Sequence, residues 1–145
     1  MQGYEQSFVS LQVVCRQGDP SSDIYLLKSG KLLACSVQGT KVIPLARISP
    51  GEFVGELSFF DGKPRASLVI ALEPSQVILI PKHELSNLLP NWYVHIGKSI
   101  TKKIRLLDGI VHGANLRKFG KEEDQKALTI DEQREILKAI TQQDS

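Results

Sequence analysis

Short apolar runs separated by frequent turns constrain the fold of this chain more than any other feature. Between Phe8 and Leu45 we expect strands over three apolar runs, which are Val9–Val14, Ile24–Leu27 and Leu32–Cys35. Turn-forming residues separate the runs, at Gln17–Pro20, Lys28–Lys31 and Gln38–Thr40. Each turn contains a glycine, which can adopt the positive φ that tight reversals need. Strands this short, with turns this frequent, favour an antiparallel sandwich or barrel over a doubly wound parallel sheet.

Two more strands and a short helix are expected further along the chain. The strands are predicted over Ala66–Leu72 and Gln76–Ile80, and the turn residues Glu73–Ser75 join them. A short helix is predicted over Lys82–Leu89, because it lies between Pro81 and Pro90 and proline is typical of helix boundaries.

A much longer helix is predicted over Asn91–Lys118, which would measure about 42 Å at ~1.5 Å per residue. Its apolar residues recur at steps of three and four and form one seam: Tyr93, Ile96, Ile100, Ile104, Leu107, Val111 and Ala114. This length exceeds the face of a small roll, so we expect the seam to form a dimer interface, with capping of the roll as the alternative. Gly97, Gly109 and Gly113 indicate either close helix contact or a break.

The last segment, 120–145, begins as a charged linker that contains Glu122–Asp124. Thr129 and Glu132 then have the spacing of a helix capping box. The helix that follows has a narrow apolar stripe of Ile130, Ile136, Leu137 and Ile140. We expect this helix to dock on a partner. The segment is too short for a winged helix-turn-helix, which needs two helices and a ribbon.

Gly51–Ser67 contains the residues with the clearest chemistry. Gly55 lacks a Cβ and lets the backbone approach a ligand, and Glu56–Phe60 is long enough for one helical turn whose free N–H groups attract a phosphate. Arg65 offers a rigid fork of donors to two phosphate oxygens, while Glu56 can accept a hydrogen bond from a hydroxyl. The stretch therefore suits a ligand with both a phosphate and a sugar.

Phe53–Ser67 also resembles the phosphate-binding cassette of the cyclic nucleotide-binding domain family. The matching residues are Phe53, Gly55, Glu56, Leu57, Ser58, Pro64, Arg65, Ala66 and Ser67. Val54 is placed as in the bacterial catabolite-activator branch, and Leu68 stands where kinase-type cassettes carry threonine. The resemblance extends over roughly 8–89 and implies an antiparallel β-roll that binds a cyclic nucleotide.

The resemblance also implies a role for each cassette residue. Arg65 would pair with the cyclic phosphate, Glu56 would accept the ribose 2′-hydroxyl, and backbone groups would complete the cradle. Ala34 and Leu45 are candidates for the wall against the base. Ala66 lacks the hydroxyl that cGMP-selective relatives present to the guanine amino group, so cAMP is expected in preference to cGMP. The predicted ligand-binding set is Gly55, Glu56, Leu57, Ser58, Arg65, Ala66, Ser67, Leu45 and Ala34.

Other function classes are not favoured by the residues present. The net charge of +2 gives no strong indication of nucleic acid or membrane binding, and no apolar run approaches the ~18 residues that span a bilayer. His83, His95 and His112 show no metal-ligand spacing, so no metal is expected. No catalytic motif is present, so no enzyme is expected. The basic residues from Lys98 to Lys121 are interpreted as a solvated helix face, with contact to nucleic-acid phosphates as the alternative.

The cysteines and the N-terminus indicate the compartment. Cys15 and Cys35 lie in apolar runs and are interpreted as buried thiols, which are typical of a reducing compartment. Met1–Ser10 lacks the pattern of a signal peptide. We therefore expect a cytoplasmic protein.

We predict a mainly β fold with C-terminal helices: an antiparallel β-roll over 1–89, a signalling and dimerisation helix over 90–119, and a linker with a terminal helix over 120–145. The predicted function is a cAMP sensor that binds without catalysis, forms a homodimer through Tyr93–Ala114, and signals to an output protein or a missing downstream domain. One alternative is a ligand-free roll that serves as an interaction module, in which Glu56 and Arg65 would pair with each other. The other is the input domain of a larger transcription factor or enzyme.

Overall fold

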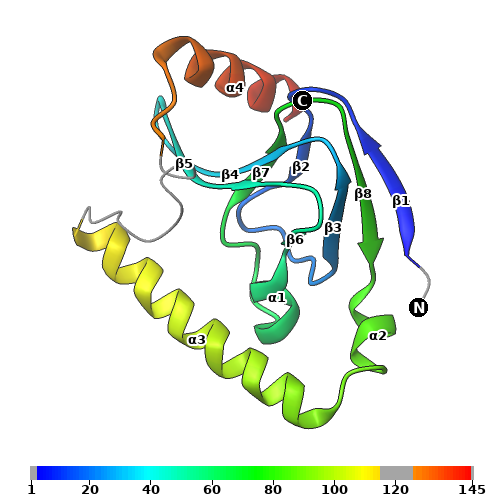
Figure 1. The fold of residues 1–145 in the computed structure, drawn as a ribbon. Helices are drawn as coiled ribbons and strands as arrows, with labels where there is room; N and C mark the ends of the chain where they lie inside the picture. Colours follow the sequence, from blue (N-terminus) through cyan, green and yellow to red (C-terminus); the bar gives the residue numbers. More distant parts are fainter. Residues whose placement is uncertain (1–2, 115–125, 145) are drawn as a thin grey trace.

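The computed structural model describes residues 3–114 and 126–144, which form eight strands and four helices (Figure 1). The strands are β1 (Tyr4–Phe8), β2 (Val13–Cys15), β3 (Ile24–Ser29), β4 (Leu32–Gln38), β5 (Lys41–Ile48), β6 (Phe53–Val54), β7 (Leu68–Ala71) and β8 (Ser75–Ile80). The helices are α1 (Glu56–Asp61), α2 (Lys82–Ser86), α3 (Asn91–Ala114) and α4 (Ile130–Gln143). The strands pair antiparallel in two four-stranded sheets, ordered β1-β8-β3-β6 and β2-β7-β4-β5. The predicted fold class, an antiparallel β-roll followed by helices, is confirmed.

The second sheet is buried on both faces. Alternate residues of a strand point to opposite faces, and β7 shows this clearly. Val69 and Ala71 belong to the core between the sheets, whereas Leu68 and Ile70 belong to a second apolar cluster on the outer face. All four residues of β7 are therefore buried, which explains why this strand is apolar throughout.

Helix α4 covers that outer face (Figure 1). Ile136 and Ile140 are buried against Leu33 and Ile70, so the terminal helix docks on the roll of its own chain. The expectation that it docks on a partner is wrong. The capping box is confirmed, because Glu132 N donates to Thr129 Oγ1 and Thr129 N donates to Glu132 Oε1, both at 3.1 Å. Ile130 does not belong to the buried stripe, since it is 69% exposed.

The N-terminal strands differ from the prediction. β1 lies at the edge of its sheet and is mostly exposed, so its polar residues show no apolar alternation that would have predicted it. The apolar run Val9–Val14 is not one strand. The chain turns there, with Leu11 at φ 64°, and only Val13 and Val14 of that run enter β2.

Helix α3 leaves the roll and packs on α1. Gly97 is the point of closest approach, because a Cβ there would lie 2.1 Å from Phe60 Cε1. Two turns further on, Arg105 forms an ion pair with Asp61. The helix continues through Gly109 and Gly113, so no break occurs at either residue. The predicted end at Lys118 lies outside the described residues, as do the linker residues 120–125.

The apolar seam of α3 is exposed. Its five described side chains are between 38% and 52% exposed: Tyr93, Ile96, Ile100, Ile104 and Leu107. The side chains of Val111 and Ala114 lie outside the described part. The seam therefore does not cap the roll within one chain. No helix in the described ranges is both long enough and apolar enough to cross a membrane.

The ion pair between Asp61 and Arg105 predicts an acid dependence of stability. Partial burial alone would raise the pKa of Asp61, but hydrogen bonds from Arg105 and from Lys63 N, with the charge of Arg105, hold this pKa below its ordinary value of 3.8. Such a carboxylate stabilises the folded state above its unfolded pKa, and this contribution disappears as the pH falls through the folded pKa. We expect Asp61→Asn to lower the melting temperature at neutral pH and to reduce the further loss on acidification below about pH 4. Thermal unfolding of both proteins at neutral and acidic pH measures these melting temperatures. An equal fall in melting temperature on acidification in the two proteins would contradict the prediction.

Candidate functional site

The predicted cassette surrounds a cavity of about 440 Å³. β6 leads through Gly55 into α1, and the chain then returns through Arg65 into β7, so the two chemical halves of the cassette face one space. Eight of the nine predicted site residues line this cavity: Ala34, Gly55, Glu56, Leu57, Ser58, Arg65, Ala66 and Ser67. Leu45 does not belong to the lining.

A β-bulge explains the position of Leu45. Ala34 pairs with Ala46, but the next residue, Cys35, pairs with Pro44, so Leu45 is the extra residue of β5. A bulge changes which side chains of a strand face a given side. Ala46 accordingly lines the cavity next to Ala34. Ala46 thus replaces Leu45 at the expected base wall. The apolar pattern of β5 alone does not locate the bulge.

Arg65 is the buried cation of the site and is only 4% exposed. Its Nη1 donates to Gly55 O at 3.1 Å, and its Nη2 donates to Asp23 O at 2.5 Å and Ser21 Oγ at 3.3 Å. The Tyr25 ring lies beside it, with the centroid 5.8 Å from Arg65 Cζ. Neutral oxygens therefore hold the guanidinium in place without neutralising its charge.

The Arg65 guanidinium has donor capacity left over. Among the described side chains, those of residues 3–107 and 126–144, no carboxylate lies within 4.0 Å of it. Its buried Nε has no hydrogen-bond partner in the same part of the chain. The ion pair with Glu56 that a ligand-free roll would favour is therefore not formed. A buried cation in this state has the chemistry to receive an anion.

Gly55 is required by both its conformation and its surroundings. Its φ of 93° is in the left-handed region, which side chains disfavour. A Cβ at this position would lie 2.2 Å from Arg65 Nη1 and 2.8 Å from Asp23 O. Any side chain here would displace the arginine. The missing Cβ of Gly55 thus leaves room for the Arg65 guanidinium, in addition to the close backbone approach predicted at the cavity.

The first turn of α1 presents backbone donors to the cavity. The first helical hydrogen bond runs from Phe59 N to Gly55 O at 3.2 Å, so the preceding N–H groups have no acceptor within the helix. Glu56 begins this turn. Although the residue as a whole is exposed, the cavity walls partly shield its carboxyl group from water and raise its pKa, while its own backbone N–H and the charge of Arg65 act in the opposite direction. A carboxyl group and a guanidinium thus lie in one cavity without pairing.

Several lining residues were not predicted: Cys15, Ala46, Arg47, Ile48, Glu52 and Val69. Glu52 directly precedes the cassette, and the other five come from strands β2, β5 and β7, which meet it only in the folded chain. Cys15 and Cys35 are both buried free thiols, as predicted, and burial raises the pKa of Cys35 to about 12. In the ranges that the structure describes, no group of three or more His, Cys, Asp or Glu side chains is arranged to hold a metal ion.

Comparison with known proteins gives a family match over the roll. The family model described as the cyclic nucleotide-binding domain matches residues 5–91, which is more than half of the chain. A cGMP-dependent protein kinase of Eimeria tenella is 34% identical over 86 residues, which are 59% of this chain and 8% of the kinase. A cAMP-dependent protein kinase regulatory subunit of Hypocrea atroviridis is 33% identical over 84 residues, 58% of this chain and 17% of the subunit. The chain thus matches less than a fifth of the length of either relative.

A solved structure shares the fold at lower identity. The catabolite activator protein of Thermus thermophilus superposes with a TM-score of 0.62 at 22% identity, covering 76% of this chain and 53% of that protein. The match supports the same β-roll architecture.

Proposed function

The chain belongs to the cyclic nucleotide-binding domain family, and from this premise we propose that the cavity beside α1 binds a cyclic nucleotide monophosphate, with cAMP preferred to cGMP. Such a ligand combines one phosphate anion, a ribose hydroxyl and a flat base. The cavity volume of about 440 Å³ lies within the range of about 300–1,000 Å³ that is typical of small-molecule sites.

The state of Arg65 is the observation that carries the proposal. A buried charge without a counter-ion is unfavourable by several kcal/mol, so an arginine that is 4% exposed and lacks a carboxylate partner among the described residues calls for an anion. The unpartnered Nε–H calls for an additional acceptor. A cyclic phosphate supplies both the charge and the acceptor oxygens.

The remaining lining residues fit the other parts of the ligand. The N–H groups at the start of α1 would complete the phosphate cradle, and the Glu56 carboxylate would accept the ribose 2′-hydroxyl. The small side chains of Ala34 and Ala46 leave room for the base. These roles are proposals for the ligand-bound protein.

Calorimetric titration with cAMP, cGMP and a cyclic dinucleotide tests the proposal directly. Saturable binding of cAMP or cGMP with one site per chain is expected. The cyclic dinucleotide should bind weakly, because its two phosphates and two bases exceed what one arginine and one cavity accommodate. The absence of heat with every one of the three compounds would overturn the proposal.

We further propose that the chain is a sensor that binds without catalysis and signals through α3. The exposed seam supports a homodimer through Tyr93–Ala114, which would place a partner helix on the surface next to α1. An output protein or a further domain would then receive the change. The two buried free thiols support a reducing compartment, and we propose the cytoplasm.

The exposed seam also favours a second candidate, a roll that assembles with another chain and binds no nucleotide. Apolar side chains in one contiguous row are typical of protein interfaces. Titration separates the two candidates, because an interaction module would assemble normally and release no heat with cAMP or cGMP.

The base preference gives a modest prediction. One hydrogen bond of the kind that Ala66 lacks is worth about 0.5–1.5 kcal/mol, so we expect cAMP to bind up to about tenfold more tightly than cGMP. Ala66→Thr should narrow the difference. Ser67→Ala is the matched variant, because the Ser67 residue also lines the cavity and carries a hydroxyl. If the unmodified protein bound cAMP and cGMP equally well, the prediction for Ala66 would be wrong. If Ser67→Ala alone then lost cGMP binding, the guanine contact would be assigned to Ser67 instead.

A further inference from the structure

The 16–19 turn holds the backbone of Arg65 on both sides. Gly18 N donates to Arg65 O, and Arg65 N donates to Asp19 O, each at 2.9 Å. The turn is closed by two hydrogen bonds of its own, from Arg16 N to Asp19 Oδ2 at 2.8 Å and from Asp19 N to Arg16 O at 3.1 Å. The position of Arg65 therefore depends on this turn as well as on the residues that contact its guanidinium.

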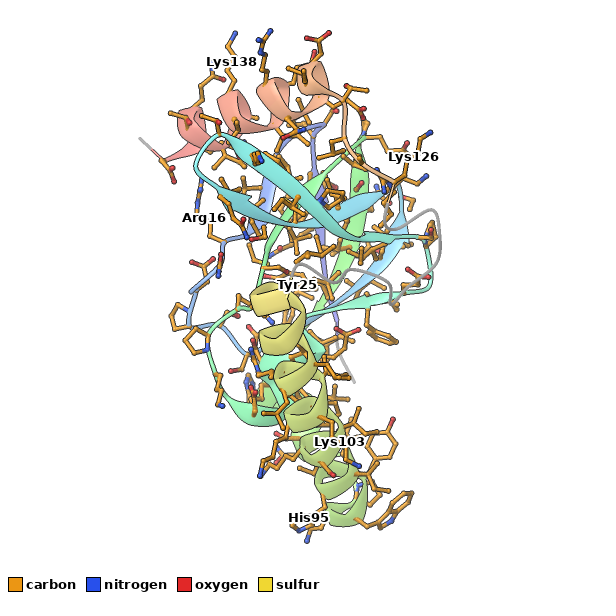
Figure 2. All side chains as sticks on the ribbon, turned by 90° about the vertical axis from the view of Figure 1, so that its left-hand side faces the viewer. Arg16, Tyr25, His95, Lys103, Lys126 and Lys138 are labelled. Carbon is orange, nitrogen blue, oxygen red and sulfur yellow. The ribbon has the colours of Figure 1, made fainter. Side chains whose placement is uncertain are left out.

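The side chain of Arg16 extends from that turn to the C-terminal end of α4. Arg16 Nη1 lies 2.7 Å from Asp144 Oδ1, and Nη2 donates to Ile140 O at 3.4 Å. Figure 2 shows Arg16 on the side of the roll below α4, whereas Lys138 projects outward from the same helix. One residue thus joins the terminal helix to the turn that holds Arg65.

Gln143 fixes the same end of α4 to the segment that leads into β2. Its Nε2 donates to Leu11 O at 2.8 Å, and its Oε1 accepts from Val13 N at 2.7 Å. Leu11 has a left-handed backbone, which needs support from its surroundings. The end of α4 therefore braces the whole segment that leads from Leu11 to the turn.

We propose that Arg16 is a positioning residue for the nucleotide site and that docking of α4 sets ligand affinity through it. This inference rests on the proposed function. Docked α4 holds Arg16, Arg16 holds the turn, and the turn holds Arg65 in the place where the phosphate binds. Because coupling between two sites is reciprocal, a bound nucleotide strengthens the docking of α4 by the same factor.

The first test measures cAMP affinity by calorimetry in variants of the 145-residue chain. Arg16→Ala and Asp144→Ala should each weaken binding by up to about fivefold, since the ion pair is partly exposed and such pairs are modest. The double variant should bind no more weakly than Arg16→Ala, because Arg16→Ala already removes the ion pair that Asp144→Ala removes. The charge exchange Arg16→Asp with Asp144→Arg should restore most of the affinity. Loss of packing alone would not be repaired by exchanged charges.

Arg134→Ala is the matched control. Arg134 forms an exposed ion pair with Asp131 on the same helix, but away from the turn, so its removal should leave affinity unchanged. Melting temperatures of all variants without ligand show whether each protein is folded.

The second test measures hydrogen exchange in α4. Saturating cAMP should slow exchange over Ile136–Gln143 in the unmodified chain, and this protection should be lost in Arg16→Ala. Unchanged affinity in a folded Arg16→Ala protein, or no restoration by the charge exchange, would overturn the inference while the proposed function stands. An unmodified chain that binds no nucleotide would overturn both.

Discussion

Arg65→Ala is expected to lower cAMP affinity by about two to four orders of magnitude while the roll stays folded. Leaving a phosphate in the cavity without its buried cation should cost roughly 3–5 kcal/mol. The fold should persist, because Gly55 O, one of the acceptors that Arg65 now occupies, belongs to a residue that lines the cavity, where water can replace the guanidinium. Calorimetry measures the affinity, and circular dichroism with thermal unfolding checks the fold.

Two further variants show whether affinity depends on the bidentate geometry of the Arg65 guanidinium or only on positive charge. Arg65→Lys keeps the charge but loses the bidentate geometry, so its affinity should fall between those of the unmodified and alanine proteins. Lys63→Ala removes an exposed cation two positions away and should have little effect. Near-normal titration by a folded Arg65→Ala protein would show that the nucleotide binds elsewhere.

The cassette could be predicted because its chemistry is contained in one short stretch. Gly55, Glu56 and Arg65 are close in sequence, and their residue types alone indicate an anion, a hydroxyl and a close backbone approach. The structure brings them to one cavity. It adds the reason for Gly55, whose missing Cβ leaves space for the guanidinium itself.

The parts that were mispredicted depend on contacts between distant segments. The bulge at Leu45 follows from how β5 pairs with β4. The neighbouring Pro44 is compatible with a bulge, but proline also suits an edge strand such as β5, so it does not locate the bulge. The docking surface of α4 includes outward residues of all four strands of the second sheet, such as Leu33 and Ile70, whose orientation is fixed only once the sheet has formed. A narrow stripe on a terminal helix predicts that a partner surface exists, but not that the surface belongs to the same chain.

Helix α3 presents two adjacent rows with different surroundings. Gly97, Thr101 and Arg105 form one row; Gly97 and Arg105 contact α1, and Thr101 is 2% exposed. The row one residue earlier, Ile96, Ile100 and Ile104, is exposed. Consecutive helical residues lie about 100° apart around the axis, so a helix docked on the second row would lie beside α1. A change in α1 on nucleotide binding would then reach the partner through α3.

Ile104→Asp is therefore expected to weaken self-association by at least about two orders of magnitude. In a parallel dimer the two copies of Ile104 lie close together, and two carboxylates placed in an apolar interface are unfavourable by several kcal/mol through desolvation and like-charge repulsion. Sedimentation by analytical ultracentrifugation measures the association. Leu106→Asp is the matched control, because Leu106 is also exposed but lies on another side of α3, and this variant should associate normally.

Hydrogen exchange over Ile100–Ala114 shows whether the same interface carries the signal. A ligand shifts an equilibrium only by its differential affinity for the two arrangements, typically about 1–3 kcal/mol, so cAMP should change exchange in this segment measurably. The change should be smaller in Ile104→Asp, because a monomer has no second arrangement of paired helices to favour. If the unmodified protein sediments as a monomer, the proposed homodimer is wrong. Exchange that is identical with and without saturating cAMP would remove the signalling role of α3 and leave a domain that binds the nucleotide without transmitting it.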